Sequence, residues 1–277
     1  RVFIEHGDRT NRNKARLKYV LDSMGHDGFL KLVEERLGKP FARVPEEALA
    51  PRPASDRLAH IGVHKQKQAG LNWIGVALPL GKVTCEQMRG LSKIAQDLGD
   101  GDIRLTVWQN LLIPGVRDTN VDLAIAAIKA VGLDVATSQV RAGLIACTGR
   151  AGCKFGLADT KRTAARIADW CDPRVSIETP INIHLTGCHH SCAQHYISDI
   201  GMIGARIPVG DTDDTVDGFH IFTGGGFGPD ADVGQEVFHD VTAEDAPLHV
   251  ERLLKAYVSN RTSPDETFLT FARPHAG

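Results

Sequence analysis

The 277-residue sequence predicts an α+β protein in which a ferredoxin-like half-domain is followed by an α/β domain. The main observation is a chain order of strand, helix, strand, strand, helix after a Pro-rich stretch. Lys and Arg total 32 against 34 Asp and Glu, so no overall basic field indicates nucleic-acid binding. The longest apolar stretch, Leu71–Leu80, contains Asn72 and Pro79 and is too short to span a bilayer.

The N-terminal segment predicts two helices. Residues Arg1 to Ile4 read as the middle of a strand, which suggests a fragment or a processed half. Apolar residues then recur at helical spacing from Leu17, which predicts a helix over Asn11–Met24 with one buried stripe, ended by a glycine. A second short helix is expected near Gly28–Leu37. The strongest linker signal follows, with Pro45, Pro51 and Pro53.

The ferredoxin-like half-domain begins with a strand over Trp73–Leu78. Thr84 and Gln87 have the spacing of a capping box, which starts a helix that continues to Leu98. A strand over Ile103–Val107 continues into Leu111–Ile113, and a helix over Val121–Val131 completes the order.

The third region predicts a domain whose strands end in glycine-bearing loops. Its expected strands are Ala142–Ala146, Ile181–Leu185, Asp199–Gly204 and Phe219–Phe222, and its expected helices are Leu157–Trp170 and Pro247–Ser259. A tail follows the last helix.

Four of the six cysteines form the most informative pattern in the chain. Cys147 and Cys153 are spaced C-x5-C, and Cys188 and Cys192 are spaced C-x3-C after a gap of 34 residues. Each pair lies where a predicted strand ends in a glycine-bearing loop. Thiolates on two such loops can converge on one inorganic centre, and the glycines allow the backbone to approach sulfur closely.

Other interpretations of the cysteines remain open at this point. A structural zinc site normally uses C-x2–4-C pairs, which fits the wider spacing poorly. Disulfides would need an oxidising compartment, for which the sequence gives no sign. Four unrelated buried thiols would be unusual in two glycine-flanked pairs. The spacing favours an iron–sulfur cluster over zinc and over no metal.

Together with three other stretches, the cysteine motifs resemble those of the sulfite/nitrite reductase haemoprotein family. The cysteine pattern is C-T-G-x3-C at Cys147, then T-G-C-x3-C at Thr186, with D-I-G starting at Asp199. The stretches around His6–Tyr19 and Ile103–Asn110 also match, the latter as R-x-T-x-x-Q-N. The resemblance covers essentially the whole chain but only the C-terminal half of a typical member.

This resemblance implies a [4Fe–4S] cluster and sirohaem as cofactors. The four cysteines would hold the cluster, and Cys192 would also be the proximal ligand of the sirohaem iron. Arg12 and Arg16 would pair with sirohaem carboxylates, although a solvated helix face is the alternative. Further cofactor-binding candidates are Thr148, Thr186, Gly187, His190, Gln109 and Asn110.

The resemblance also implies a domain organisation. Residues 1–45 would be the tail of a preceding sirohaem-binding domain, residues 46–138 a ferredoxin-like subdomain, and residues 139–277 a [4Fe–4S]/sirohaem-binding domain of the sulfite/nitrite reductase type. The catalytic residues that bind the anion would lie in the N-terminal half of the same protein. The fragment alone is therefore expected to be inactive.

The implied function is an oxidoreductase that converts nitrite to ammonia in six one-electron steps. Ferredoxin or a similar carrier would supply the electrons, the substrate would be a small anion, and the location would be cytoplasmic, without nucleic acid or membrane as a partner. Alternatives are an assimilatory sulfite reductase, a precorrin-3B synthase-like protein and a non-catalytic zinc-binding module. The residues His189 and His190 between the last two cysteines depart from the Pro-Asn that plant-type relatives usually carry there.

Overall fold

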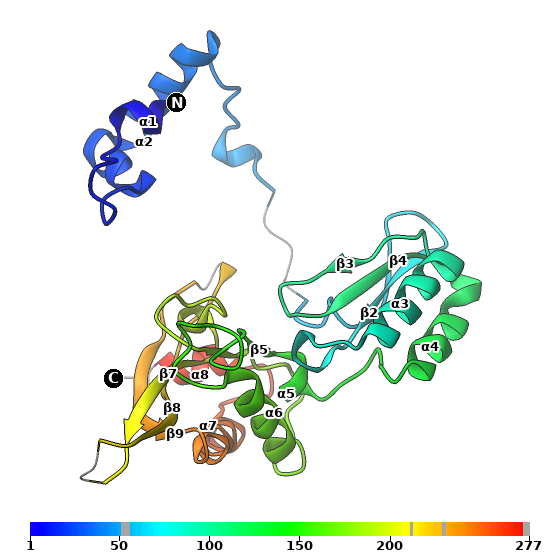
Figure 1. Ribbon diagram of the computed structural model, residues 1–277. Helices are drawn as coiled ribbons and strands as arrows, with labels where there is room; N and C mark the ends of the chain where they lie inside the picture. The colour runs from blue at the N-terminus through cyan, green and yellow to red at the C-terminus, as the bar shows by residue number, and fades with distance from the viewer. Residues whose placement is uncertain (51–55, 211–212, 229–230, 274–277) are drawn as a thin grey trace. The chain divides into compact units, whose positions relative to one another are not determined.

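The protein forms two compact units in a computed structural model, which describes residues 1–50, 56–210, 213–228 and 231–273. The first unit is Arg1–Ser55 and the second is Asp56–Gly277 (Figure 1). Pro51 and Pro53 of the expected linker lie outside the described residues. Among the helices in the described parts of the chain, none has both the length and the apolar character needed to cross a membrane.

All the regular secondary structure in the described residues of the first unit is helical. It contains α1 (Val2–His6), α2 (Leu17–Leu37) and the 3₁₀ turn η1 (Glu46–Ala48), so the prediction of a strand at the first residues is wrong. A kink at Gly25, where φ is +73°, divides α2 at the predicted helix end. The ion pair of Arg36 with Glu5 joins the two helices.

The helix predicted from Asn11 begins only at Leu17, and its apolar stripe is not uniformly buried. The Asp8 carboxylate accepts hydrogen bonds from the backbone N–H groups of Thr10 and Asn11, which holds this segment in turns instead of a helix. Val20 is buried, whereas 44% of Leu17 is exposed.

The second unit starts with a four-stranded antiparallel sheet. The strand order is β1-β2-β4-β3, with bounds Gly62–Lys65, Leu71–Val76, Leu111–Arg117 and Arg104–Leu105. Helices α3 (Cys85–Leu98) and α4 (Val121–Ala130) pack on one face of this sheet, as Figure 1 shows. The predicted capping box of Thr84 and Gln87 is confirmed. This is the expected ferredoxin-like half-domain, and its aliphatic core includes Ile74 and Ile113.

Strand β3 is shorter than the predicted strand over Ile103–Val107. Thr106 ends it, because its backbone N–H donates to the Asn110 carbonyl and its hydroxyl accepts from the Asn110 N–H. The result is a tight turn over residues 106–110, which holds Gln109 at φ +59°.

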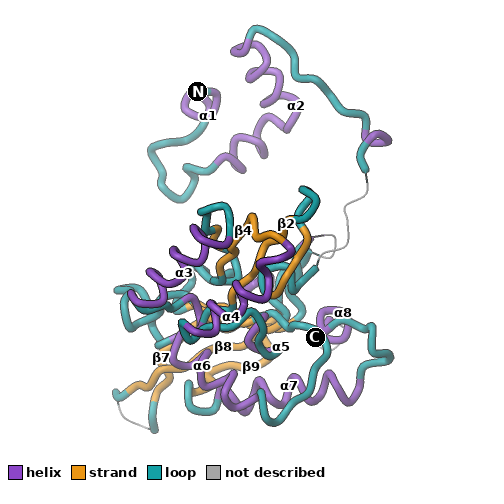
Figure 2. Tube along the Cα trace, turned by 90° about the vertical axis from the view of Figure 1, so that its right-hand side faces the viewer, coloured by secondary structure: helices purple, strands orange, loops and turns teal. Residues whose placement is uncertain are grey.

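The second unit continues with a five-stranded mixed sheet. The order is β5-β6-β7-β8-β9, in which β5, β6 and β7 are parallel and β7, β8 and β9 are antiparallel. Their bounds are Leu144–Ala146, Ile183–Thr186, Ile200–Pro208, Thr215–Thr223 and Gln235–Thr242. Helix α6 (Thr160–Cys171) packs against β5, β6 and helix α7 (Ala246–Asn260), as Figure 2 helps to follow.

Short elements complete the second unit. Helix α5 (Gln139–Ala142), capped by Ser138, occupies the start of the predicted strand Ala142–Ala146, so that strand begins at Leu144. Strands β1 and β9 and helix α8 (Phe268–Ala272) were not predicted from the sequence. Three 3₁₀ turns also occur, η2 (Pro79–Gly81), η3 (Asp118–Asn120) and η4 (His195–Ile197).

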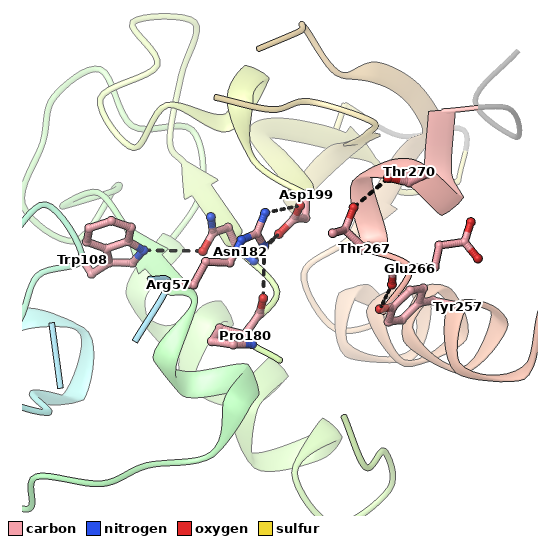
Figure 3. A network of polar contacts seen from close by, with 9 residues as sticks. All are labelled: Arg57, Trp108, Pro180, Asn182, Asp199, Tyr257, Glu266, Thr267 and Thr270. Carbon is pink, nitrogen blue, oxygen red and sulfur yellow. Dashed lines mark hydrogen bonds and ion pairs between the residues drawn. The ribbon is translucent and has the colours of Figure 1, made fainter. Parts of the chain in front are cut away.

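Polar contacts join the two sheets of the second unit (Figure 3). Arg57, which precedes β1, donates to the buried Asp199 carboxylate at 2.7 Å and to the Pro180 carbonyl at 3.1 Å. The same carboxylate accepts from the Asn182 N–H at 2.7 Å, and the Asn182 side chain accepts from the Trp108 indole at 3.5 Å. Asp199, which opens the D-I-G stretch, therefore fixes the segment that leads into β6.

Candidate functional site

The site is built where two parallel strands end. Ala146 of β5 lies opposite Leu185 of β6, so both strands end at the same edge of the sheet. Cys147 follows β5 directly, and its N–H donates to the Leu185 carbonyl at 3.0 Å. Cys188 comes two residues after the end of β6. The convergence of the two cysteine loops follows from the parallel pairing.

All four cysteines line one cavity of about 610 Å³. All of them are free thiols, so the disulfide alternative is wrong for this structure. Cys188 is buried, Cys147 and Cys153 are half-buried, and Cys192 is exposed. The four sulfur-bearing side chains therefore share one space instead of lying in unrelated parts of the core.

Three glycines let the two loops meet behind the sulfur atoms. A Cβ on Gly187 would lie 3.2 Å from the Gly149 Cα, 3.3 Å from the Gly156 Cα and 3.6 Å from the Cys147 Sγ. The Gly187 N–H donates to the Cys147 Sγ at 3.1 Å. The Leu157 N–H donates to the Gly187 carbonyl at 2.8 Å, which ties the loops together. Backbone N–H groups directed at sulfur are the kind of contact that tunes iron–sulfur clusters.

Hydroxyl and imidazole groups complete the polar surroundings of the cysteines. The Thr186 side chain lines the cavity, and its Oγ1 is buried without a hydrogen-bond partner in the described structure. The His190 Nδ1 lies 3.3 Å from the Cys188 Sγ. The Thr160 hydroxyl donates to the Cys147 carbonyl at 2.6 Å. These groups suit a sulfur-ligated centre, since they place hydrogen-bonding atoms at its edge.

The spacing of the cysteines is unlike that of a closed zinc site. Within the described parts of the chain, one group of three potential metal ligands has its atoms all within 4.8 Å of one another, namely His220, His239 and Asp240. No three of the four cysteine sulfurs therefore lie that close together. A tetrahedral zinc site with Zn–S distances of about 2.3 Å would hold its sulfurs about 3.8 Å apart. The four cysteines therefore leave room for a centre larger than one zinc ion.

The structure brings most of the predicted site residues to this cavity. Gln109, Thr148, Thr186 and Gly187 line it with the cysteines. Gln109 comes from the turn that ends β3, and its Nε2 donates to the Ala146 carbonyl at 2.8 Å.

Asn110 does not line the cysteine cavity. Its Oδ1 accepts from the Leu78 N–H, and its Nδ2 lies 2.8 Å from the His60 Nδ1. Arg12 and Arg16 belong to the first unit, where Arg16 donates to the Ala15 carbonyl. The predicted contacts of these three residues with a cofactor stay predictions.

Lys161 is a cavity residue that was not predicted from the sequence. It lies in the first turn of α6 and lines the cavity together with Cys147. Burial lowers the pKa of the Lys161 ammonium, and the positive charge of Lys82 lowers it further, whereas Cys147 raises it. No local motif marks this lysine, since its partners come from three distant segments.

Two family models match the chain over nearly its whole length. The model described as "Nitrite and sulphite reductase 4Fe-4S domain" matches residues 1–41 and 137–266. The model described as "Nitrite/Sulfite reductase ferredoxin-like half domain" matches residues 64–131. The first match contains all four cysteines, and the second contains the antiparallel sheet from His64 onward.

Several known proteins are similar to this chain. A ferredoxin–nitrite reductase of Synechococcus elongatus is 35% identical over 91% of the chain and 48% of its own length. A sulfite reductase [ferredoxin] 2 of Mycolicibacterium paratuberculosis is 33% identical over 94% of the chain and 47% of its own length. The solved structure of the Mycobacterium tuberculosis NirA protein matches with a TM-score of 0.85 at 32% identity, over 96% of the chain and 49% of that protein. The chain thus spans about half the length of these relatives.

Proposed function

The chain belongs to the nitrite and sulphite reductase family, whose cofactors are a [4Fe–4S] cluster and sirohaem, and we propose on that premise that it is the cluster-bearing half of a nitrite reductase. The reaction would convert nitrite to ammonia with six electrons. The observation that carries the proposal is the single cavity lined by four free cysteines at the ends of parallel strands.

Cys147, Cys153, Cys188 and Cys192 would hold the cluster, which supplies one-electron transfer when bound. Cys192 would also ligate the sirohaem iron, and its exposure at the cavity supports this second role. Gly187 would hydrogen-bond the Cys147 sulfur, as it does here. Thr148, Thr186, Gln109 and His190 would contact the cofactors from the cavity and its edge.

The remaining parts of the proposal rest on the relatives. Ferredoxin is named as the donor of the Synechococcus elongatus enzyme, and we extend a ferredoxin-like one-electron donor to this protein. The anion-binding residues would lie in the part of the longer relatives that this chain does not cover. We also retain the division at residues 45/46 and 138/139 as a proposal, and the cytoplasm as the expected location.

Sulfite reduction is the second candidate function. The similarity to a sulfite reductase, at 33% identity, nearly equals the similarity to the nitrite reductase, at 35%. Both substrates are small anions that would be reduced by six electrons. The cysteine cavity itself does not distinguish between them.

The test uses the full-length protein that contains this chain. Its iron, acid-labile sulfide and sirohaem content are measured first, and its rates with nitrite and sulfite are then compared with reduced ferredoxin as the donor. We expect four cluster irons, one sirohaem and a higher kcat/KM for nitrite. A higher value for sulfite would select the second candidate. Stoichiometric zinc without labile sulfide, or a cluster without sirohaem, would refute the reductase proposal.

A further inference from the structure

The cavity wall contains one cation that is fixed by hydrogen bonds. The Lys161 Nζ lies 2.6 Å from the Leu80 carbonyl, 3.0 Å from the Ala146 carbonyl and 3.4 Å from the Gln109 Oε1. Three acceptors match the three donors of an ammonium group, whereas a neutral amine has only two. The arrangement therefore holds the charged form of Lys161 in place despite its partial burial.

The position of this charge is set by three chain segments. Leu80 belongs to η2, Gln109 to the turn that follows β3, and Ala146 to the last position of β5. Ala146 directly precedes Cys147, so the same carbonyl that holds the ammonium is adjacent to a cluster ligand. Lys161 cannot move away from the cysteines without losing all three bonds.

The other cation that lines the cavity is held less firmly. Lys154 is exposed, and its Nζ lies 5.0 Å from the centre of the Phe155 ring. Water and salt screen exposed charges strongly, whereas a partly buried charge is screened less. Of the two lysines that line the cavity, Lys161 is therefore the one whose charge is screened less by water and salt.

We propose that Lys161 is a positioning residue that raises the reduction potential of the cluster held by the four cysteines. One-electron reduction adds one negative charge among the cysteine sulfurs. A fixed positive charge beside them stabilises the reduced form more than the oxidised form. This inference rests on the proposed function, because it needs the cluster in this cavity.

If Lys161 had a purely structural role, its replacement would lower stability and leave the reduction potential of the cluster unchanged. Its three hydrogen bonds join the two sheets of the second unit, so its loss would also lower thermal stability. Lys161→Met keeps the length and apolar stem of the side chain but removes its charge. Lys161→Arg keeps a charge at the same place. Arg162→Met removes an exposed charge from the next position of α6 and is the matched control.

The experiment is a redox titration of the holoprotein, in which EPR measures the reduced cluster. For Lys161→Met we expect the ratio of reduced to oxidised cluster at a fixed potential to fall about tenfold, which is about 59 mV for a one-electron couple. Lys161→Arg should restore most of the shift, and Arg162→Met should leave the potential unchanged. Lys161→Gln repeats the loss of charge with a polar side chain.

The outcomes separate this inference from the proposed function. A wild-type protein without cluster iron and labile sulfide would refute the proposed function itself. Full cluster content with an unchanged potential in Lys161→Met and Lys161→Gln would overturn the inference alone. Loss of the cluster in both neutral variants would also overturn it, because Lys161 would then serve to retain the cluster and not to set its potential.

Discussion

The two sheets of the second unit differ in what their strand ends carry. In the antiparallel sheet, neighbouring strands end at opposite edges, so the loops that follow consecutive strands lie at different edges of the sheet. In the parallel part of the five-stranded sheet, β5 and β6 end side by side, and their loops bring four cysteines to one cavity. The direction of pairing thus decides where the chemistry of this chain can lie.

The antiparallel sheet still contributes to the site, but as a support. Gln109 reaches the cavity from the turn after β3, and Trp108 donates to Asn182 ahead of β6. Arg57, which precedes β1, holds Asp199 at the start of β7. One sheet carries the loops with the four cysteines and the other holds the segments beside them in place, and this division can be tested residue by residue.

The largest expected effect comes from the cysteines themselves. Cys192→Ser removes a thiolate of the cavity and should abolish both cluster and sirohaem binding in the full-length protein. Cys85→Ser is the matched control in the antiparallel region, where Cys85 is exposed at the start of α3. Iron, labile sulfide and the sirohaem absorption bands measure both outcomes. Equal cofactor loss in the two variants would contradict the division between the sheets.

The glycine contacts behind the sulfurs should give the next largest effect. Gly187→Ala would place a Cβ 3.2 Å from the Gly149 Cα, push the cysteine loops apart and lower the iron content of the folded protein to a small fraction. Gly75→Ala would crowd the His60 carbonyl at 2.5 Å in the antiparallel sheet. Both variants should lose about 1–3 kcal/mol of stability.

The two glycine variants should differ in the amount of cluster bound per folded molecule, and not in the kind of stability loss. Iron per folded molecule should fall in Gly187→Ala and stay at the wild-type ratio in Gly75→Ala. If the ratio fell equally in both, cluster binding would depend on general stability, and the glycine contacts at the loops would have no special role.

The ion pair of the half-buried Arg57 with the buried Asp199, which joins the sheets, should give a smaller effect, on folding. Asp199→Asn leaves Arg57 without a carboxylate partner and should lower the free energy of unfolding by about 2–4 kcal/mol. Asp97→Asn breaks the exposed pair with Lys93 on α3 and should leave the denaturation midpoint unchanged. Chemical denaturation measures both. A loss of similar size for Asp97→Asn would show that burial is not the cause.

Acid sensitivity should differ between the parallel and antiparallel parts of the five-stranded sheet. Burial lowers the pKa of His184 on β6 to about 4, whereas its ordinary value is 6.5. The unfolded chain therefore binds more protons than the folded chain between pH 6.5 and about 4, so stability falls as the pH falls through this window. His184→Gln should remove about 1–2 kcal/mol of that loss.

For His239 on β9, the pH dependence of stability has the opposite sign to that of His184. Its hydrogen bond with Glu236 raises the pKa of His239, so this group stabilises the fold at low pH, and the contribution is lost as the pH rises. His239→Gln should therefore not reduce the acid loss. Denaturation midpoints between pH 4 and 7 measure both variants. A smaller acid loss in His239→Gln than in His184→Gln would contradict the assignment.

Local patterns in the sequence were enough to predict many elements. Neighbouring residues alone predict the capping box at Thr84, the helix break at Gly25 and the helix α4 that begins at Val121. The observed start of α2 at Leu17 and the observed end of β3 at Leu105 could not be predicted in this way. In both places side chains or backbone groups form turns that compete with the regular element.

The amino-acid sequence alone indicated which four cysteines would hold a cluster, because they recur with glycines at two predicted strand ends and match the motifs of the family. Their surroundings follow from tertiary contacts. Lys161 and Arg57 become partners of the site through contacts between segments that are far apart in the chain. No local pattern encodes such contacts, since they exist only once parallel strand pairing and the packing of two sheets have placed those segments side by side.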